Sequence, residues 1–177
     1  VRSRRQRQMC IRDSIGTGLM GFPMASNLLK AGIKLQVFNR SISKAEPLKE
    51  FGAEISNTLS SVVKDTDFII TMLTDDGAVE AIMSHPDFLN NLNSGSTVID
   101  MSSIKPNTAI KYGNIFKSKD INYLDAPVSG GTIGAEEGSL AIMVGGEQSV
   151  FDKSINILKA MGLSLIHISE PTRLRRI

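Results

Sequence analysis

The sequence predicts an α/β fold in which a doubly wound, mainly parallel sheet carries helices on both faces. Short apolar runs alternate with amphipathic stretches of helical length, which is the pattern of βαβ units. Some runs are continuously apolar, as at residues 68–70, and such strands are typically buried on both faces of a parallel sheet. Gly16, Gly18 and Gly21 have the spacing G-x-G-x-x-G, which is typical of the turn from a first strand into a first helix.

Each apolar run predicts one element of this fold. We expect strands at residues 34–39, 67–73, 96–101, 121–126 and 139–146. The amphipathic stretches predict helices at residues 20–31, 43–51, 59–64, 77–83, 106–118 and 147–160. Pro106 suits the first turn of a helix, and Gly32 suits a C-terminal helix cap.

The two ends of the chain are predicted to be translations of a sequencing adapter. Residues 8–13, QMCIRD, can be encoded by CAG ATG TGT ATA AGA GAC, followed by AG. The reverse complement of that stretch encodes Leu-Ser-Leu-Ile-His-Ile, which is the sequence of residues 163–168. A natural basic arm and a natural tail would be complementary only by chance. We therefore leave residues 1–14 and 163–177 out of the fold prediction and assign 15–162 to one dinucleotide-binding domain.

The terminal segments also decide the charge of the chain. The whole sequence has 20 Lys+Arg and 18 Asp+Glu residues, a net charge of +2. The two ends hold eight arginines against Asp13 and Glu170, so residues 15–162 keep 12 basic and 16 acidic residues, a net of −4. The basic balance that would indicate nucleic acid or an anionic membrane thus lies in the ends, and we expect neither partner.

The remaining composition excludes two further classes of site. Residues 15–162 contain no cysteine, and His85 is their single histidine. We therefore expect no metal site of the zinc type and no thiol nucleophile. No apolar run is long enough to span a membrane, and a cytoplasmic location is the expectation.

The glycine motif predicts a site for the pyrophosphate of a dinucleotide. Gly16 would permit a tight turn, Gly18 would let the backbone approach the phosphates, and Gly21 would let the helix pack closely on the strand. The helix dipole favours negative charge at the helix start, near Met20. Cofactor contacts are expected from Gly16, Thr17, Gly18, Leu19, Met20 and Gly21.

Asn39 and Arg40 follow the next strand, at the distance expected for residues that contact the adenosine ribose. A carboxylate there would bind the 2′-hydroxyl of NAD and repel a 2′-phosphate. Asn39 is uncharged and Arg40 offers a planar guanidinium suited to phosphate. We therefore expect NADP as cofactor, with NAD as the alternative. An arginine that is merely solvated in a loop is the other interpretation of Arg40.

Taken together, the motifs resemble those of the β-hydroxyacid dehydrogenases. IGTGLMGFPMASNLLKAG, NR, TML, VIDMSSIKP, DAPVSGG and LAIMVGG occur in the order seen in that family. The resemblance covers residues 15–162 and extends to the cofactor domain of 6-phosphogluconate dehydrogenase, a Rossmann-type fold. DMSSI, DAPVSGG and KAM are most similar to the tartronate semialdehyde (2-hydroxy-3-oxopropionate) reductases. The 3-hydroxyisobutyrate dehydrogenases and imine-reductase-like members are alternatives.

This resemblance implies an NADP-dependent oxidoreductase that transfers hydride between nicotinamide and a small β-hydroxyacid or semialdehyde. It implies nicotinamide contacts from Met72, Leu73 and Ser103. Core packing is the alternative interpretation of the first two. It also implies that the substrate carboxylate is held by Ser129, Gly130 and Gly131. A serine hydroxyl and the N–H groups of a Gly-Gly turn suit an anion, whereas a plain turn is the alternative.

No catalytic residue is assigned within residues 15–162. The resemblance implies a catalytic lysine, acting as general acid, in an all-helical second domain that also pairs subunits into a homo-oligomer. Lys105 and Lys159 do not match its motif, and His85 is expected in a surface loop. We expect Asp100 and Asp125 to cap strand ends. The chain is therefore expected to bind cofactor without reducing substrate. A non-catalytic nucleotide-binding module is the alternative, and a substrate cradle at residues 129–131 would argue against it.

The resemblance leaves only Ile15 of the family's first strand. The central position of the sheet is then vacant, and we expect residues 9–14 to be drawn into it. That would place Arg12 and Asp13 where apolar residues belong.

Overall fold

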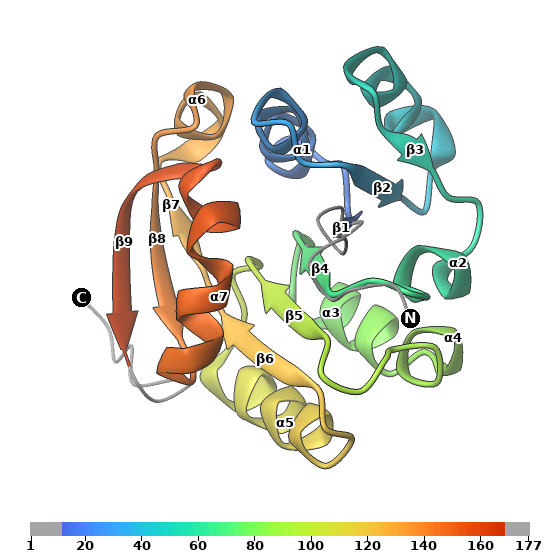
Figure 1. Ribbon diagram of the computed structural model, residues 1–177, viewed down its shortest axis with the longest axis vertical. Helices are drawn as coiled ribbons and strands as arrows, with labels where there is room; N and C mark the ends of the chain where they lie inside the picture. The colour runs from blue at the N-terminus through green and yellow to red at the C-terminus, as the bar shows by residue number, and fades with distance from the viewer. Residues whose placement is uncertain (1–11, 169–177) are drawn as a thin grey trace, which may run out of the picture.

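Nine strands of residues 12–168, the part of the chain that the computed structural model describes, form one sheet (Figure 1). Their order is β3-β2-β1-β4-β5-β6-β8-β7, and β9 pairs with β8. The strands are β1 (Arg12–Ile15), β2 (Leu35–Phe38), β3 (Glu54–Ile55), β4 (Phe68–Thr71), β5 (Thr97–Asp100), β6 (Asn122–Asp125), β7 (Val128–Ser129), β8 (Leu140–Gly145) and β9 (Gly162–Ile168).

Helices connect the strands and cover the sheet. The α-helices are α1 (Gly21–Lys30), α2 (Leu59–Val63), α3 (Asp76–Met83), α4 (Pro86–Leu89), α5 (Pro106–Lys117), α6 (Gly131–Glu137) and α7 (Gln148–Lys159). Two 3₁₀ helices, η2 (Ile42–Lys44) and η3 (Glu46–Phe51), follow β2. No helix within residues 12–168 is long and apolar enough to cross a bilayer.

The connections create a switch point beside β1. From β1 the chain moves outward to β2 and β3, and then returns to β4 on the other side of β1. These strands, with β5 and β6, are parallel, so their carboxyl ends meet at one edge. Ligands of open α/β sheets bind at this edge, where the strand order reverses. The predicted α/β fold, doubly wound and mainly parallel, is confirmed.

Apolar side chains on the two faces of the sheet form two core clusters. One includes Met24 and Leu28 of α1, Leu48 of η3 and Ile157 of α7. The other is built from α2, α3, α4 and α5. Helix α5 shows why the sequence folds this way. Pro106 begins it, and Ala109, Tyr112 and Phe116 are buried along one side at helical spacing.

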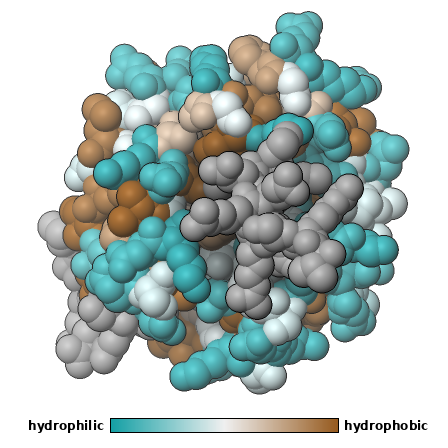
Figure 2. Space-filling model, in the orientation of Figure 1, coloured by the Kyte–Doolittle hydropathy of each residue, from teal (hydrophilic) through white to brown (hydrophobic). Residues whose placement is uncertain are grey.

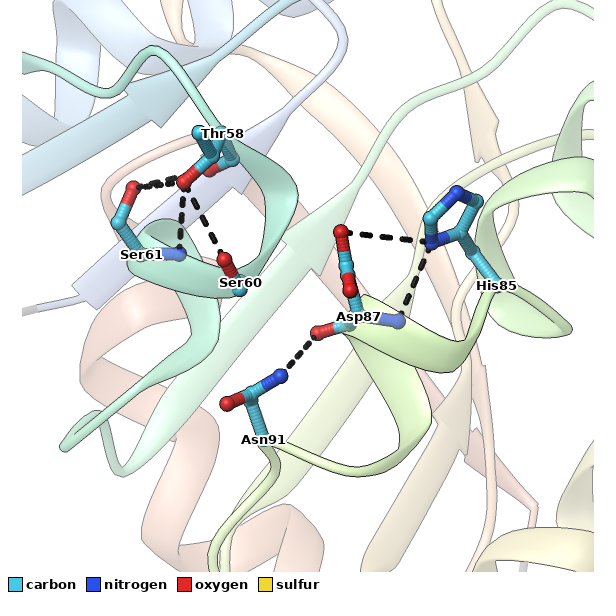
Figure 3. A network of polar contacts seen from close by, with 6 residues as sticks. All are labelled: Thr58, Ser60, Ser61, His85, Asp87 and Asn91. Carbon is cyan, nitrogen blue, oxygen red and sulfur yellow. Dashed lines mark hydrogen bonds and ion pairs between the residues drawn. The ribbon is translucent and has the colours of Figure 1, made fainter.

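Two side-chain caps begin short helices on the second face (Figure 3). The Thr58 hydroxyl accepts a hydrogen bond from Ser61 N at 3.2 Å and begins α2. His85 Nδ1 accepts one from Asp87 N at 3.1 Å and begins α4. His85 is exposed, as expected, but it starts a short helix rather than lying in a loop.

The predicted helix at residues 43–51 is wrong in type. The segment forms η2 and η3 instead, with Pro47 in the first turn of η3 and Gly52 in the left-handed region at its end, at φ 91°. An apolar spacing of three residues fits a 3₁₀ turn as well as an α-helix. The elements β3, β7, α4 and α6 were not predicted.

Residues 162–168 form β9, although the sequence prediction left residues 163–177 outside the fold. The strand runs parallel to β8, with Ala141 opposite Ser164 and Gly145 opposite Ile168. The His167 ring stacks on Phe151, with centroids 4.4 Å apart. An edge strand needs backbone pairing and one apolar face, and this segment supplies both. Its origin in adapter DNA stays a prediction.

Residues preceding the glycine loop occupy the central strand position of the sheet, as expected. Residues 12–15 lie between β2 and β4, with Asp13 opposite Gln36 and Ile69; residues 9–11 lie outside the described part. Asp13 is fully buried on the same face as Ile15, because side chains alternate along a strand. Burial raises the pKa of the Asp13 carboxyl to about 8, against a smaller lowering by the Thr66 hydroxyl.

The surface carries apolar groups in separate places. Figure 2 shows hydrophobic patches between hydrophilic ones on one face of the molecule. Leu19, Leu163 and Ile133 are the most exposed large apolar side chains of the described residues. Isolated residues of this kind are normal on protein surfaces.

Candidate dinucleotide-binding site

The glycine loop continues directly from β1. Gly16 N donates to Phe38 O at 3.1 Å, and Met72 N donates to Ile15 O at 3.0 Å. Gly16 has φ 98°, and a Cβ there would lie 2.3 Å from Met72 O. A Cβ at Gly21 would lie 2.0 Å from Gly16 O. Both positions therefore require glycine for the fold itself.

Gly18 differs from the other two glycines. A Cβ at Gly18 would meet no atom within 4 Å, and the residue is exposed. The protein does not need glycine here for its own packing, but a ligand lying against the backbone would need the space. The three glycines thus have the separate geometries that the fingerprint predicts.

A hollow of about 250 Å³ opens beside this loop at the switch point. It brings together the ends of β1, β2 and β4 and one face of α3. It is lined by Ile15, Gly16, Gly18, Phe38, Asn39, Arg40, Ser41, Lys44, Met72, Leu73, Thr74, Ala78, Ala81 and Ile82. Open space at Gly18, an apolar floor and cations at the rim fit one half of a dinucleotide.

A larger hollow of about 630 Å³ adjoins the first and shares Gly18 and Lys44 with it. It runs along α1 past Phe22 and Lys30 toward Phe51 of η3. Its lining includes none of the strand-end residues expected to bind the cofactor. The smaller hollow therefore matches the chemistry better.

Asn39 holds the glycine loop in place. Its Oδ1 accepts a hydrogen bond from Thr17 N at 2.9 Å, and its Nδ2 donates to Ser41 O at 2.9 Å. Arg40, next to it, is exposed at the rim of the hollow. Of the two residues predicted to contact the ribose, Asn39 thus also has a structural task.

The loops after β4 and β5 are joined by hydrogen bonds. Ser102 Oγ accepts from Leu73 N at 2.9 Å. Asp100 Oδ1 accepts from Thr71 Oγ1 at 2.8 Å and from Ser102 N at 3.1 Å. Asp100 therefore caps the end of β5, as expected, and fixes the loop that carries Met72 and Leu73.

Asp100 and Asp125 stand opposite each other at the ends of β5 and β6. Burial raises the pKa of the Asp100 carboxyl, against smaller lowering effects from its hydrogen bonds to Ser102 and Thr71. Burial, with a smaller contribution from the charge of Asp100, raises the pKa of the Asp125 carboxyl to about 7. Tyr123 donates a hydrogen bond to Asp100 Oδ2 at 3.4 Å. Both carboxyls are buried, and the hydrogen bonds of Asp100 hold the end of β5.

The predicted carboxylate cradle lies on a separate element. Ser129 ends β7, and Gly130 and Gly131 lead into α6 with φ of 131° and 62°. All three are exposed, and none lines the hollow beside the glycine loop. Two consecutive positive φ values make a turn in which backbone N–H groups can face one ligand.

Comparison with known proteins places this arrangement in a family. The NAD-binding domain of 6-phosphogluconate dehydrogenase matches residues 14–169. The chain belongs to this family. A nicotinamide dinucleotide is therefore its cofactor class.

Individual relatives narrow the family further. The 2-(hydroxymethyl)glutarate dehydrogenase of Eubacterium barkeri is 38% identical over 157 residues, 88% of this chain and 52% of the relative. The 2-hydroxy-3-oxopropionate reductase of Escherichia coli is 38% identical over 152 residues, which are 85% of this chain and 52% of the relative. A structure of Mycobacterium tuberculosis 3-hydroxyisobutyrate dehydrogenase with L-serine superposes with a TM-score of 0.88 at 30% identity. The superposition covers 93% of this chain and 56% of the 3-hydroxyisobutyrate dehydrogenase chain.

These relatives confirm the resemblance to NAD(P)-dependent β-hydroxyacid dehydrogenases, enzymes that act on CH–OH groups. The chain spans about half the length of the curated relatives it matches.

Two residues of this 6-phosphogluconate dehydrogenase-type domain that support or line the hollow were not predicted, Ser102 and Lys44. Ser102 is buried and bonded to Leu73, whereas the predicted Ser103 is exposed and does not line the hollow. The neighbouring serines in DMSS gave no sign of which one faces inward. Lys44 lines the hollow with Arg40, and its position four residues after Arg40 was the available signal.

Proposed function

We propose that this chain is the cofactor domain of an NADP-dependent reductase or dehydrogenase of small β-hydroxyacids. The observation that carries the proposal is the hollow at the switch point. Gly18 leaves open space there, and Arg40 lies at the rim. Gly16 to Gly21 would hold the pyrophosphate through backbone N–H groups at the start of α1.

The charges of the hollow support NADP over NAD. Arg40 and Lys44 are its charged lining residues, and no carboxylate is among them. Guanidinium and ammonium groups bind a 2′-phosphate, while the acidic residue that typically binds an unmodified ribose is replaced by Asn39. Asn39 Nδ2 already donates one hydrogen to Ser41 O, so Asn39 would donate its other amide hydrogen to the ribose.

The arrangement also supports a role for the strand-end loops in hydride transfer. Bound NADP(H) supplies the hydride at its nicotinamide C4. Met72 and Leu73 are half-buried and would pack against the ring, because Ser102 and Asp100 fix their loop. Ser103, exposed beside them, would contact the same half of the cofactor.

The turn at residues 129–131 supports a substrate with a carboxylate group, which it would bind through the Ser129 hydroxyl and backbone N–H groups. Tartronate semialdehyde (2-hydroxy-3-oxopropionate) is the favoured substrate. 3-Hydroxyisobutyrate and, further away, a substrate of the imine-reductase kind are the enzyme alternatives. A non-catalytic nucleotide-binding module is the alternative of another class, and carboxylate binding by a longer form of the protein would contradict it.

We further propose that the 177-residue chain binds cofactor but does not turn over substrate. The family's general-acid lysine matches no residue of 15–162, and the homo-oligomer would form through a helical second domain.

Two measurements test these proposals on the chain as it is. Quenching of intrinsic tyrosine fluorescence, or calorimetry, should show saturable binding of NADPH, tighter than that of NADH. Equal affinities would remove the preference for NADP, and no binding of either at millimolar concentration would contradict the cofactor site. Absorbance at 340 nm should stay constant when NADPH and tartronate semialdehyde are mixed with the chain. Enzyme-dependent oxidation of NADPH would contradict the second proposal.

A further inference from the structure

A single side chain joins the cofactor helix to the helix that carries the predicted carboxylate cradle. Asn27, in the C-terminal half of α1, donates from Nδ2 to Ala135 O of α6 at 2.7 Å. Glu136 O lies 3.5 Å from the same nitrogen. The two helices are neighbours in Figure 1 although more than 100 residues separate them in the sequence.

Helix α6 depends on contacts of this kind. It has seven residues and no side-chain cap at its start, and isolated helices shorter than about 12 residues are marginal in water. Its last carbonyls have no partners within the helix. Asn27 supplies a donor to one of them.

The turn after α6 makes room for this contact. Gly138 ends the helix in the left-handed region, at φ 67°. A Cβ at Gly138 would lie 3.3 Å from Asn27 Nδ2, closer than an ordinary contact. At the other end of α6, Leu140 packs against both Gly130 and Gly134, where added Cβ atoms would lie 3.3 Å from its side chain. The cradle thus has two anchors, Leu140 beneath it and Asn27 at the far end of its helix.

We propose that Asn27 is a positioning residue that transmits order from the cofactor loop to the turn Ser129–Gly131. This inference rests on the proposed function, because it assumes that NADP⁺ binds at the start of α1. Binding there restrains α1 as a rigid body. Through the hydrogen bond from Asn27, α6 becomes more ordered as well. The turn Ser129–Gly131 then loses less conformational entropy when a carboxylate binds.

Hydrogen–deuterium exchange of the 177-residue chain tests the inference, with NADP⁺ as the probe. In the unmodified protein, saturating NADP⁺ should slow exchange at residues 17–24 and also at residues 128–137. In Asn27→Ala, residues 17–24 should still be protected, while a protection of about threefold or more in α6 should be lost.

Asn91→Ala is the matched control. Asn91, just after α4, also donates from Nδ2 to a backbone carbonyl, Asp87 O at 2.9 Å, but away from the site (Figure 3). This variant should show both protections. Asn27→Asp provides a second test, because it keeps the shape of the side chain and removes the donor; it should behave as Asn27→Ala.

The outcomes separate the two proposals. If NADP⁺ leaves residues 17–24 of the unmodified chain unprotected, the proposed cofactor site is wrong. If those residues are protected but α6 responds equally in Asn27→Ala and in the unmodified chain, or in neither, Asn27 does not transmit order. If both Asn27 variants fail to fold, its role is structural and the inference is likewise overturned.

Discussion

The side chain of Asn39, at the end of β2, accepts a hydrogen bond from the backbone N–H of Thr17 at 2.9 Å, 22 residues away in the sequence. Thr17 lies between the first two glycines of the fingerprint. The residue that follows β2 and is proposed to contact the adenosine ribose therefore also holds the loop proposed to bind the pyrophosphate. Because the Thr17 N–H already has this partner, we expect other N–H groups of the loop to bind the phosphates.

Removing this hydrogen bond should weaken both the loop and cofactor binding. We expect Asn39→Ala to lower the free energy of unfolding by about 1 kcal/mol and NADPH affinity by about tenfold, measured by urea denaturation and by titration. Asn122→Ala is the control, because Asn122 Nδ2 donates to Gly95 O at 3.1 Å away from the site. It should cost stability and leave affinity unchanged. Unchanged affinity in Asn39→Ala would show that the loop is held in other ways.

Alanine at two glycines of the fingerprint should separate folding from binding. Gly18→Ala places Cβ in open space, so the melting temperature should stay unchanged while NADPH affinity falls by at least about tenfold. Gly21→Ala drives Cβ against Gly16 O and should destabilise the fold by about 3 kcal/mol. Calorimetric melting and NADPH titration of both variants check this contrast. Full NADPH affinity in Gly18→Ala would mean that no ligand lies against that backbone.

The cations of the hollow should decide between the two nicotinamide cofactors. Arg40→Ala should lower NADPH affinity by about tenfold or more, since it removes a charge-assisted contact, and should leave NADH affinity nearly unchanged. Lys44→Ala should have the same sign and a smaller effect, because its ammonium is a mobile point charge. Lys34 is exposed before β2 and lies outside the hollow, so the control variant Lys34→Ala should change neither affinity. Parallel losses for both cofactors in Arg40→Ala would contradict a 2′-phosphate contact.

Asp13 should make the protein less stable as the pH rises. Burial raises its pKa in the folded state to about 8, above the ordinary value of 3.8, so the folded state binds more protons than the unfolded state between about pH 4 and 8. The free energy of unfolding must then fall with rising pH across this window. Asp13→Val should remove that slope and stabilise the fold by about 2 kcal/mol at pH 8, measured by urea denaturation at pH 5, 7 and 9.

Asp67→Asn is the control for this prediction, because Asp67 is exposed just before β4. It should keep the slope of the unmodified protein. A slope that survives in Asp13→Val would assign the pH dependence to other groups, of which Asp125, with a pKa raised to about 7, is the next candidate.

Much of the fold could be predicted because buried strands have short, mainly apolar sequences. All five strands predicted from such sequences were found, at β2, β4, β5, β6 and β8. Helix α6 could not be predicted, since Gly131 and Gly134 within it have poor helix propensity. Asn27 and Leu140 contact it from outside, and such contacts leave no periodic trace in the sequence.

The candidate site was predictable to a similar degree. Turns and strand ends carry local signals, so the glycine loop, Asn39 and Arg40 were found at the rim of one hollow. The family resemblance implied a role for Ser103 and none for Ser102, and neighbouring serines look alike in a sequence. Only the hydrogen bond from Leu73 N shows which of them points inward.

The sequence by itself determined the alternation of strands and helices and the separate tasks of the glycines, because these depend on spacing along the chain. The tertiary structure decided which groups meet: Asn39 with Thr17, Ser102 with Leu73, and Asn27 with α6. It also decided the environments of Asp13 and Asp125. A pKa and a long-range hydrogen bond are set by whatever packs nearby, and packing is fixed only when distant segments come together.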